Sequence, residues 1–255
     1  MKIKSTFLEG FGASFASFRL IGKNKSILFF YIIPFLLNII ILSLLVYLAF
    51  SNIAPFLRNY LTGDAWYIRL LNTLIAPILL MLLFFITVIV YGFLGNILCS
   101  PFLNTLSQKT QEIISGKKYH ESFSFKGFLQ NFTRTFKNFF KMLLIIIIVS
   151  LFSMLLLFIP VVGAVLYSII GYITSSFILG LQFIEYPLER EKYTFTQKLR
   201  IAWKFRYSVI GLGMSFLIVS TIPILGFLGI NMGVMGGAII FEKNILSTPL
   251  IDKTE

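Results

Sequence analysis

Four long stretches of this 255-residue chain contain no charged residue, and they restrict its fold more than any other feature. A helix needs roughly 20 consecutive apolar residues to cross the hydrocarbon core of a bilayer, and each stretch reaches that length. We therefore predict an all-α integral membrane protein that forms a single polytopic membrane domain over residues 1–255. The four apolar stretches are 27–50, 70–108, 142–184 and 207–241.

The composition excludes the main classes of soluble protein. Hydrophobic residues make up 57% of the chain and charged residues 13%, whereas soluble domains average about 45–50% and about 25%. Too little polar surface remains to coat a soluble enzyme, a disordered chain or a disulfide scaffold. The net charge of +12 is therefore interpreted as marking the ends of membrane segments, and we expect no nucleic-acid partner.

Residue types that carry catalysis or bind metals are scarce. A single Cys99 cannot form an internal disulfide, and a single His120 cannot build a histidine-rich metal site. The common hydrolase, metalloprotease and nucleotide-binding motifs are absent from the sequence. We expect no enzyme activity, no metal and no cofactor, and we interpret Cys99 as a small buried thiol.

Prolines and glycines divide the longer stretches. The segments Ile159–Gly163 and Ile222–Gly226 share the pattern Ile-Pro-x-x-Gly, and proline ends a helix while glycine permits a tight reversal. Each is predicted to be the tip of a helical hairpin, formed by Pro160 and Gly163 or by Pro223 and Gly226; the alternative is a proline kink within one helix.

Two of the apolar stretches differ in length from a single membrane crossing, and each allows two arrangements. Each half of the 207–241 stretch is shorter than a standard crossing, so this hairpin either makes two short crossings or is re-entrant and only partly penetrates the bilayer. The 70–108 stretch forms either one long tilted helix or a helix with a tail. Because Pro77 lies near its start and Pro101 near its end, its straight part is predicted to span residues 78–100.

Two phenylalanine-rich stretches have the periodicity of amphipathic interfacial helices. Their basic residues favour either a cationic surface that gathers anions and anionic lipids, or ordinary packing of a helix on the positively charged side of the membrane. The phenylalanines of the two stretches are Phe7, Phe11, Phe15 and Phe18, followed by Phe125, Phe128, Phe132, Phe136 and Phe139.

The distribution of Lys and Arg predicts the orientation. Residues 1–25 carry five, 109–141 carry seven and 185–206 carry six, against two in 51–69 and none at the hairpin tips. Basic residues accumulate on the cytoplasmic side. Both termini are therefore predicted to be cytoplasmic, with residues 51–69 and both tips outside.

Polar residues inside the apolar stretches are interpreted mainly as contacts between helices. Glu185 differs, because it ends a long apolar run just before Tyr186 and Pro187, which are expected to stop the helix. It is predicted either to pair with a basic residue of the 197–206 stretch or to titrate at the mouth of a pathway, and we favour the pair. The polar positions are Asn38, Thr73, Thr87, Asn96, Ser100, Ser175, Ser176, Gln182 and Asn231.

Several of these segments resemble the CysZ family of bacterial sulfate permeases, which also includes the eukaryotic etoposide-induced membrane proteins. The resemblance covers nearly the whole chain in length and segment order. It rests on Pro34 and Asn38 in the first stretch, on the small-Pro-Phe element Ser100, Pro101 and Phe102, on Pro160 and Gly163, and on Gln182, Glu185, Tyr186 and Pro187.

The resemblance implies a self-associating, multi-pass protein of the bacterial cytoplasmic (inner) membrane that admits sulfate or a related oxyanion for cysteine synthesis. The family's Gly-x-Arg-Arg turn is absent, because positions 26–29 read Ser-Ile-Leu-Phe here. Lys23, Lys25 and Ser26 are the candidate anion-binding residues at that place. The alternative is a protein of the same fold that shapes or scaffolds the bilayer without transporting.

Overall fold

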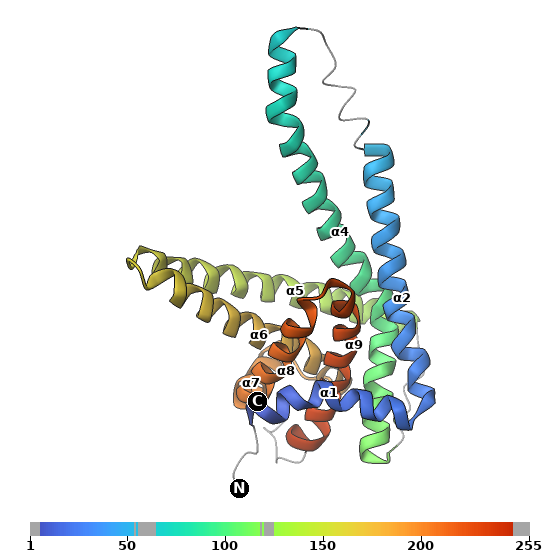
Figure 1. The fold of residues 1–255 in the computed structure, drawn as a ribbon. Helices are drawn as coiled ribbons and strands as arrows, with labels where there is room; N and C mark the ends of the chain where they lie inside the picture. The colour runs from blue at the N-terminus through green and yellow to red at the C-terminus, as the bar shows by residue number, and fades with distance from the viewer. Residues whose placement is uncertain (1–5, 54, 56–64, 118, 120–124, 247–255) are drawn as a thin grey trace. The chain divides into compact units, whose positions relative to one another are not determined.

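The computed structural model describes residues 6–53, 55, 65–117, 119 and 125–246, and these residues form helices joined by turns, with no β-strand among them (Figure 1). Five helices are long and apolar enough to cross a membrane, and a bent helix pair raises the number to as many as six. The predicted all-α integral membrane class is confirmed. The chain clusters into two units, Met1–Tyr31 with Leu103–Glu255 (unit 1) and Ile32–Phe102 (unit 2), so a single membrane domain stays a prediction.

Unit 2 contains most of α2 (Lys25–Leu48), the π-helix η1 (Ala49–Ile53) and the first part of α4 (Trp66–Ser115). The helix α4 passes through both Pro77 and Pro101. Neither proline ends it, because backbone groups in lipid have no water to bond and helical pairing is retained around an isolated proline. Of the two alternatives predicted for this stretch, one long helix is the one observed, and it extends beyond the predicted straight part, residues 78–100, at both ends. Apart from small contacts such as Ala49 against Leu83, most apolar side chains of this unit are exposed, as lipid contact requires.

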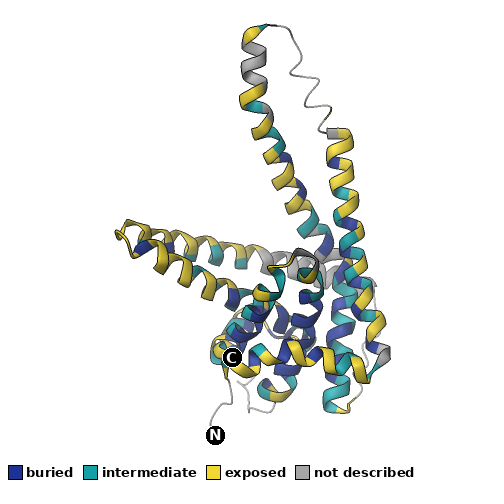
Figure 2. Ribbon diagram, viewed as in Figure 1, coloured by how far each residue is buried: buried dark blue, intermediate teal, exposed yellow. Residues whose placement is uncertain are grey.

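The core of unit 1 is built by four helices, α1 (Phe7–Lys23), α6 (Gly163–Arg190), α8 (Arg206–Ser220) and α9 (Pro223–Ile240), which pack on one another. All residues from 231 to 241 are buried, and Figure 2 shows the buried positions concentrated on these helices.

The helix α1 forms where the phenylalanine periodicity predicts it, and a reciprocal capping box of Thr6 and Glu9 starts it. Its buried face, however, consists of Gly10, Ala13, Ser14 and Ser17, at the helical spacing i, i+3, i+4, i+7. Phe15 and Phe18 are exposed. The small residues let α1 approach α8 and α9 closely, and the phenylalanines are left for the bilayer.

The helix break predicted at Ile159–Gly163 is present, and the membrane hairpin stays a prediction. The chain runs through α5 (Phe125–Met154), the short 3₁₀ helix η2 (Leu155–Phe158), a turn at residues 159–162, and α6. The left-handed backbone conformation falls on Val161, with φ of 66°, and not on the glycine. Gly163 serves a different purpose, because a Cβ there would lie 2.0 Å from the carbonyl oxygen of Leu156. The glycine allows α6 to start directly against the end of η2.

The helix break predicted at Ile222–Gly226 is also present, between α8 and α9, but its Pro and Gly have other roles than predicted. The chain reverses at Thr221 and Ile222, and Pro223 is the first residue of α9, a position where a missing N–H is harmless. Gly226 therefore lies within the first turn of α9 rather than at the reversal. A Cβ at Gly226 would meet Ser220 only at 3.4 Å.

The expectation that Tyr186 and Pro187 stop the helix is wrong, because α6 continues to Arg190. Proline removes only one helical hydrogen bond, and Pro187 and Leu188 are buried in unit 1. The helix ends instead where Tyr193 N–H donates to the carbonyl of Leu188 and Lys192 takes a left-handed φ of 62°. The next helix, α7 (Phe195–Lys204), begins with a capping box of Thr194 and Gln197 and bends by 93° into α8.

Candidate functional site

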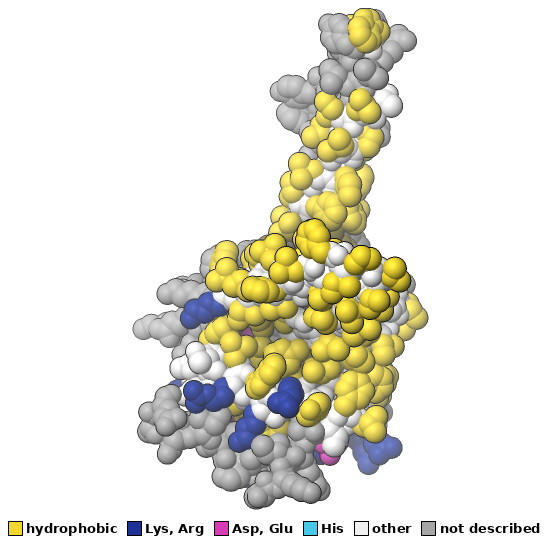
Figure 3. Space-filling model, turned by 90° about the vertical axis from the view of Figure 1, so that its left-hand side faces the viewer, with side chains coloured by type: hydrophobic (Ala, Val, Ile, Leu, Met, Phe, Trp, Pro, Cys, Tyr) yellow, Lys and Arg dark blue, Asp and Glu magenta, His cyan; other side chains and the backbone are white. Residues whose placement is uncertain are grey.

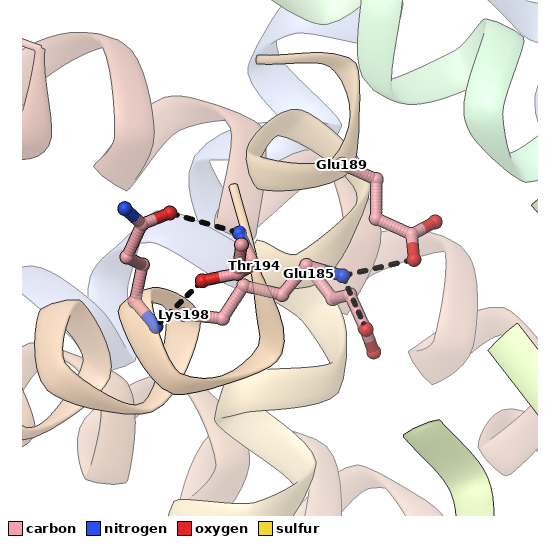
Figure 4. A network of polar contacts seen from close by, with 5 residues as sticks. Glu185, Glu189, Thr194 and Lys198 are labelled. Atoms are coloured by element: carbon pink, nitrogen blue, oxygen red, sulfur yellow. Dashed lines mark hydrogen bonds and ion pairs between the residues drawn. The ribbon is translucent and has the colours of Figure 1, made fainter. Parts of the chain in front are cut away.

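The most buried charge among the described residues is Lys198, whose side chain is 2% exposed. Its Nζ lies 2.6 Å from Oε1 of Glu185 and 2.8 Å from Oε1 of Glu189 (Figure 4). The predicted pairing of Glu185 with a basic residue of the 197–206 stretch is confirmed. A second carboxylate, Glu189, one helical turn further along α6, was not anticipated.

The local structure explains why Lys198 points inward. The capping box at Thr194 and Gln197 starts α7, and Figure 4 shows Thr194 beside the ion pair. Lys198 then falls on the same face as the buried Ile201 and Ala202. An ammonium on that face is stabilised only by paired carboxylates, which α6 supplies from successive turns.

A second polar cluster gathers around Arg190, the last residue of α6. Its guanidinium donates from Nη1 to Oε1 of Gln111 and from Nη2 to the Oδ1 and the carbonyl of Asn104, at 2.8 and 3.1 Å. Gln111 is 2% exposed. These bonds fasten the end of α6 to the part of α4 that belongs to unit 1.

Glu242 extends this cluster from the π-helix η3 (Phe241–Ile245). Its Oε1 accepts from Nε2 of Gln111 at 2.8 Å and from the hydroxyl of Tyr119 at 2.7 Å. Burial, together with the hydrogen bond and charge of Glu242, raises the pKa of Tyr119 to about 12. The phenol therefore stays protonated and donates to the carboxylate throughout the physiological pH range.

Together these residues form a polar layer where α4, α6, α7 and η3 meet, which we define by Gln111, Glu185, Arg190, Lys198 and Glu242. Lys198 pairs with carboxylates of α6, and Gln111 bonds to both Arg190 and Glu242, so each of the two clusters locks helices together. Among the described residues, no group of three or more His, Cys, Asp or Glu is placed to hold a metal ion. Sequence reasoning missed Arg190, Gln111 and Glu242, because no local pattern connects residues so distant along the chain.

The three candidate anion-binding residues lie at the junction of α1 and α2. Lys23 ends α1 and is exposed, and Asn24 alone separates the two helices. The helix α2 begins at Lys25, so Ser26 lies within its first turn and the N-cap position predicted for Ser26 falls to Asn24. The carbonyl of Asn24 accepts from the N–H of Ile27 at 3.1 Å. The anion-binding role stays a prediction.

One further cation lies near this junction. The ammonium of Lys109, from α4, lies 5.4 Å from the ring centroid of Phe30, one turn after Ser26 in α2. A cation of α4 thus lies against α2 one turn after the candidate residues, whereas the side chains of Lys25 and Ser26 lie outside the described residues. The sequence contains no signal for this approach, because Lys109 is one of seven basic residues in its segment.

In unit 2 the family-motif residue Asn38 joins two helices. Its Oδ1 accepts from the hydroxyl of Tyr91 at 2.9 Å, and its Nδ2 donates to the carbonyl of Pro34 at 2.8 Å and to Sγ of Cys99 at 3.3 Å. Cys99 is 2% exposed, so its interpretation as a buried thiol is confirmed. Ser100, Pro101 and Phe102 continue α4 without a break.

Other polar residues of the apolar stretches have mixed roles. Asn231 of α9 donates from Nδ2 to the carbonyl of Tyr31 at 2.6 Å, which is a contact between helices as predicted. Thr87 and Ser176 instead bond carbonyls of their own helices. Gln182 and Ser175 are exposed, and the side chain of Asn96 lies outside the described residues.

Long apolar helices, closely packed small residues and a buried polar layer define a multi-pass helical membrane protein. The chain belongs to the Sulfate transporter CysZ/Etoposide-induced protein 2.4 family, whose model matches residues 13–230. The family resemblance inferred from the motifs is confirmed.

Curated relatives align along most of this chain. A sulfate transporter CysZ of Vibrio parahaemolyticus is 24% identical over 236 residues, covering 92% of this chain and 95% of the relative. Sulfate transporter CysZ of Vibrio cholerae El Tor is 24% identical over 244 residues, covering 95% and 97%. The Pseudomonas aeruginosa protein of that name is 21% identical over 214 residues, covering 84% and 87%.

Proposed function

We propose that this protein is an inner-membrane permease that admits sulfate or a related oxyanion to the cytoplasm. The observation that carries the proposal is the alignment with proteins named sulfate transporter CysZ over 92% of this chain and 95% of the relative. The alignment covers nearly all of both chains, which supports a shared membrane fold and not a likeness of one segment. We further propose that the protein is not an enzyme and that it acts as a homo-oligomer.

The α1–α2 junction is the proposed anion site. Lys23, Lys25 and Lys109 supply positive charge, and the first turn of α2 presents backbone N–H groups at the positive end of the helix dipole. The lysines replace the arginine pair of the family pattern as separate point charges, which attract an anion without a bidentate fork. Basic-residue counts assign the junction to the cytoplasmic side, where a transported anion leaves.

The polar layer supports the same assignment by exclusion. Lys198 faces two carboxylates, and Gln111 connects Arg190 to Glu242. An anion entering there would meet at least as many negative as positive groups, and its repulsion by the carboxylates would be strong at low dielectric. The lysines of the α1–α2 junction are the better place for an oxyanion.

The test is uptake of radiolabelled sulfate into proteoliposomes containing the purified protein. Parent protein should accumulate label above protein-free vesicles, and Lys23→Ala with Lys25→Ala should reduce uptake by an amount that shrinks as salt rises. Lys109→Ala should reduce it further. Lys117→Ala, which removes an exposed lysine at the end of α4, is the matched control and should leave uptake unchanged.

A scaffolding protein that shapes the bilayer is the second candidate. The exposed Phe15 and Phe18 on α1 favour this candidate, because interfacial aromatic residues insert into the headgroup region. The absence of the family's arginine pair also favours it. Electron microscopy of vesicles with and without the protein separates the two. Remodelled vesicles without sulfate uptake would replace the permease assignment, and uptake with unchanged vesicle shape would retain it.

A further inference from the structure

The outer face of α7 and its junction with α8 combine exposed aromatic rings with cations. Trp203 is 65% exposed and Tyr207 is 52% exposed. The guanidinium carbon of Arg206 lies 5.6 Å from the ring centroid of Trp203 and 4.9 Å from that of Tyr207. These three side chains form one group at the bend between the helices.

Two further cations lie along α7. Lys204 directly follows Trp203 in the sequence, and Lys141 from α5 lies 5.5 Å from the ring centroid of Phe195 at the start of α7. Residues 195–207 contain no acidic residue. The carboxylates of the adjoining α6 turn, Glu185 and Glu189, are both bonded to Lys198 on the opposite, buried face of α7.

The position of this surface relative to the bilayer follows from the bend. The helix α8 packs beside α9, which together with η3 forms a stretch, Leu225–Ile245, long and apolar enough to cross the membrane. Because α7 turns by 93° from α8, it runs along the membrane plane when α8 runs across it. Figure 3 shows Lys and Arg side chains beneath a broad apolar area on one face, as expected at a membrane–water boundary.

Two contacts hold α7 in this orientation. Lys198 fixes its inner face to α6, and Trp203 packs edge-on against Phe177 of α6 with ring centroids 5.9 Å apart. The cationic and aromatic groups are therefore presented on a rigid element and not on a loop. Such preorganisation lowers the entropic cost of binding.

We propose that the α7 surface, defined by Lys141, Trp203, Lys204, Arg206 and Tyr207, binds the headgroup of an anionic phospholipid. Tryptophan and tyrosine prefer the interface, where an apolar ring and a polar edge are both satisfied. Arginine presents a planar fork that matches a phosphodiester. The inference needs only that the protein is embedded in a bilayer, and it is independent of the proposed sulfate transport.

The experiment uses Trp203 as its own reporter. The chain has two tryptophans, Trp66 and Trp203, so Trp66→Phe in the full-length protein leaves Trp203 as the only tryptophan emitter. The protein is placed in vesicles that contain either brominated phosphatidylglycerol or brominated phosphatidylcholine, diluted with the unbrominated form of the other lipid. Bromine quenches tryptophan on contact, so the two titrations give the relative affinity for the two lipids.

Phosphatidylglycerol should quench Trp203 at lower mole fraction than phosphatidylcholine does. Arg206→Gln should lower this preference roughly fivefold, since one basic residue near an anionic surface contributes about a factor of five, and Lys204→Gln should lower it in the same direction. Lys117→Gln, the charge-matched control at an exposed position just after α4, should leave the preference unchanged. Quenching by phosphatidylcholine should be the same in all variants, which shows that Trp203 still contacts lipid.

Equal quenching by the two lipids in the parent protein would overturn the proposal, as would a preference that survives Arg206→Gln combined with Lys204→Gln. Inorganic phosphate added at constant ionic strength separates a lipid site from a site for free anions. A lipid site keeps its preference, whereas loss of the preference would assign the surface to soluble oxyanions and refute the lipid assignment.

Discussion

Nζ of Lys198 lies 2.6 Å from Oε1 of Glu185, and the lysine side chain is 2% exposed. A cation so far removed from water is stable only while its partners compensate for lost hydration. Glu185 and Glu189 belong to α6 and Lys198 belongs to α7, so this triad joins the end of a membrane helix to the start of an interfacial one. The contact positions α7, and with it the Trp203 and Arg206 side chains at its far end.

Replacing Lys198 with methionine should destabilise the protein by about 3 kcal/mol, because two neighbouring carboxylates lose their shared cation. Thermal unfolding of detergent-solubilised protein measures the change. Lys192→Met, which removes an exposed lysine from the preceding turn, should have little effect. Lys198→Met combined with Glu185→Gln should recover part of the loss; a double variant as unstable as the sum of both single variants would argue against the triad.

Gly163 and Gly226 occupy the same place in the two Ile-Pro-x-x-Gly segments but should respond differently to alanine. A Cβ at Gly163 would lie 2.0 Å from the carbonyl oxygen of Leu156, whereas a Cβ at Gly226 would lie 3.4 Å from its nearest neighbour. Gly163→Ala should therefore reduce the yield of monodisperse protein in size-exclusion chromatography, and Gly226→Ala should not. Equal behaviour of the two variants would contradict the different roles assigned to the two glycines.

Gly180 and Gly171 allow a matched comparison within α6. A Cβ at Gly180 would approach the carbonyl oxygen of Val209 to 2.0 Å, while nothing lies within 4 Å of a Cβ at Gly171. Gly180→Ala should lower the free energy of unfolding by about 1–3 kcal/mol, because the added Cβ would overpack the backbone contact. Gly171→Ala should be neutral or slightly stabilising, since alanine favours helix by about 1 kcal/mol. Thermal scans of the two variants test this, and a tolerated Gly180→Ala would mean that α6 and α8 are not in close contact.

Asn38→Ala should loosen unit 2 and expose its thiol. The asparagine bonds Tyr91 and Cys99 of the neighbouring helix, and such bonds contribute about 0.6 kcal/mol each in membranes. We expect a loss of about 1 kcal/mol and faster maleimide labelling of Cys99. The control is Asn52→Ala, which removes an exposed amide that bonds only Leu48 and Ser51 of its own segment. Maleimide should label Cys99 in this variant at the same rate as in the parent protein.

Reporter fusions test the topology. Fusions after Lys25, Lys198 and Glu255 should report the cytoplasm, and a fusion after Ala65 should report the outside. Basic residues concentrate around Lys25 and Lys198, and the predicted topology returns the C-terminus to the same side. A fusion after Lys118, which lies outside the described residues, should also report the cytoplasm. Signals from both sides at every site would indicate insertion in two orientations.

The membrane class and the helix breaks at the two Ile-Pro-x-x-Gly segments follow from the sequence because the forces behind them act locally. An uncharged run such as 27–50 must be helical in lipid, where each backbone group has to find its partner within its own segment. The break at Pro160 is equally local. The small-residue face of α1, from Gly10 to Ser17, also has helical spacing in the sequence. The phenylalanine periodicity of the same helix predicts only its membrane-facing side.

Prolines mark the limit of that local reasoning. Pro77, Pro101 and Pro187 all lie inside helices, because the packing and apolar surroundings of the flanking turns outweigh one lost hydrogen bond. Pro223, by contrast, starts a helix. The residue type is the same at all four positions, and only the surroundings determine which role it takes.

The sequence by itself determined the fold class, the family and the pairing of Glu185 with a nearby base, since the partners lie within 13 residues of each other. Only the tertiary structure decided that Arg190 reaches Gln111 across 79 residues and that Lys109 lies over Phe30 beside the candidate anion turn. The physical reason is that apolar length and helix periodicity act along the chain. The partners of a buried charge are instead set by which helices pack together, and that packing depends on side chains from the whole of unit 1.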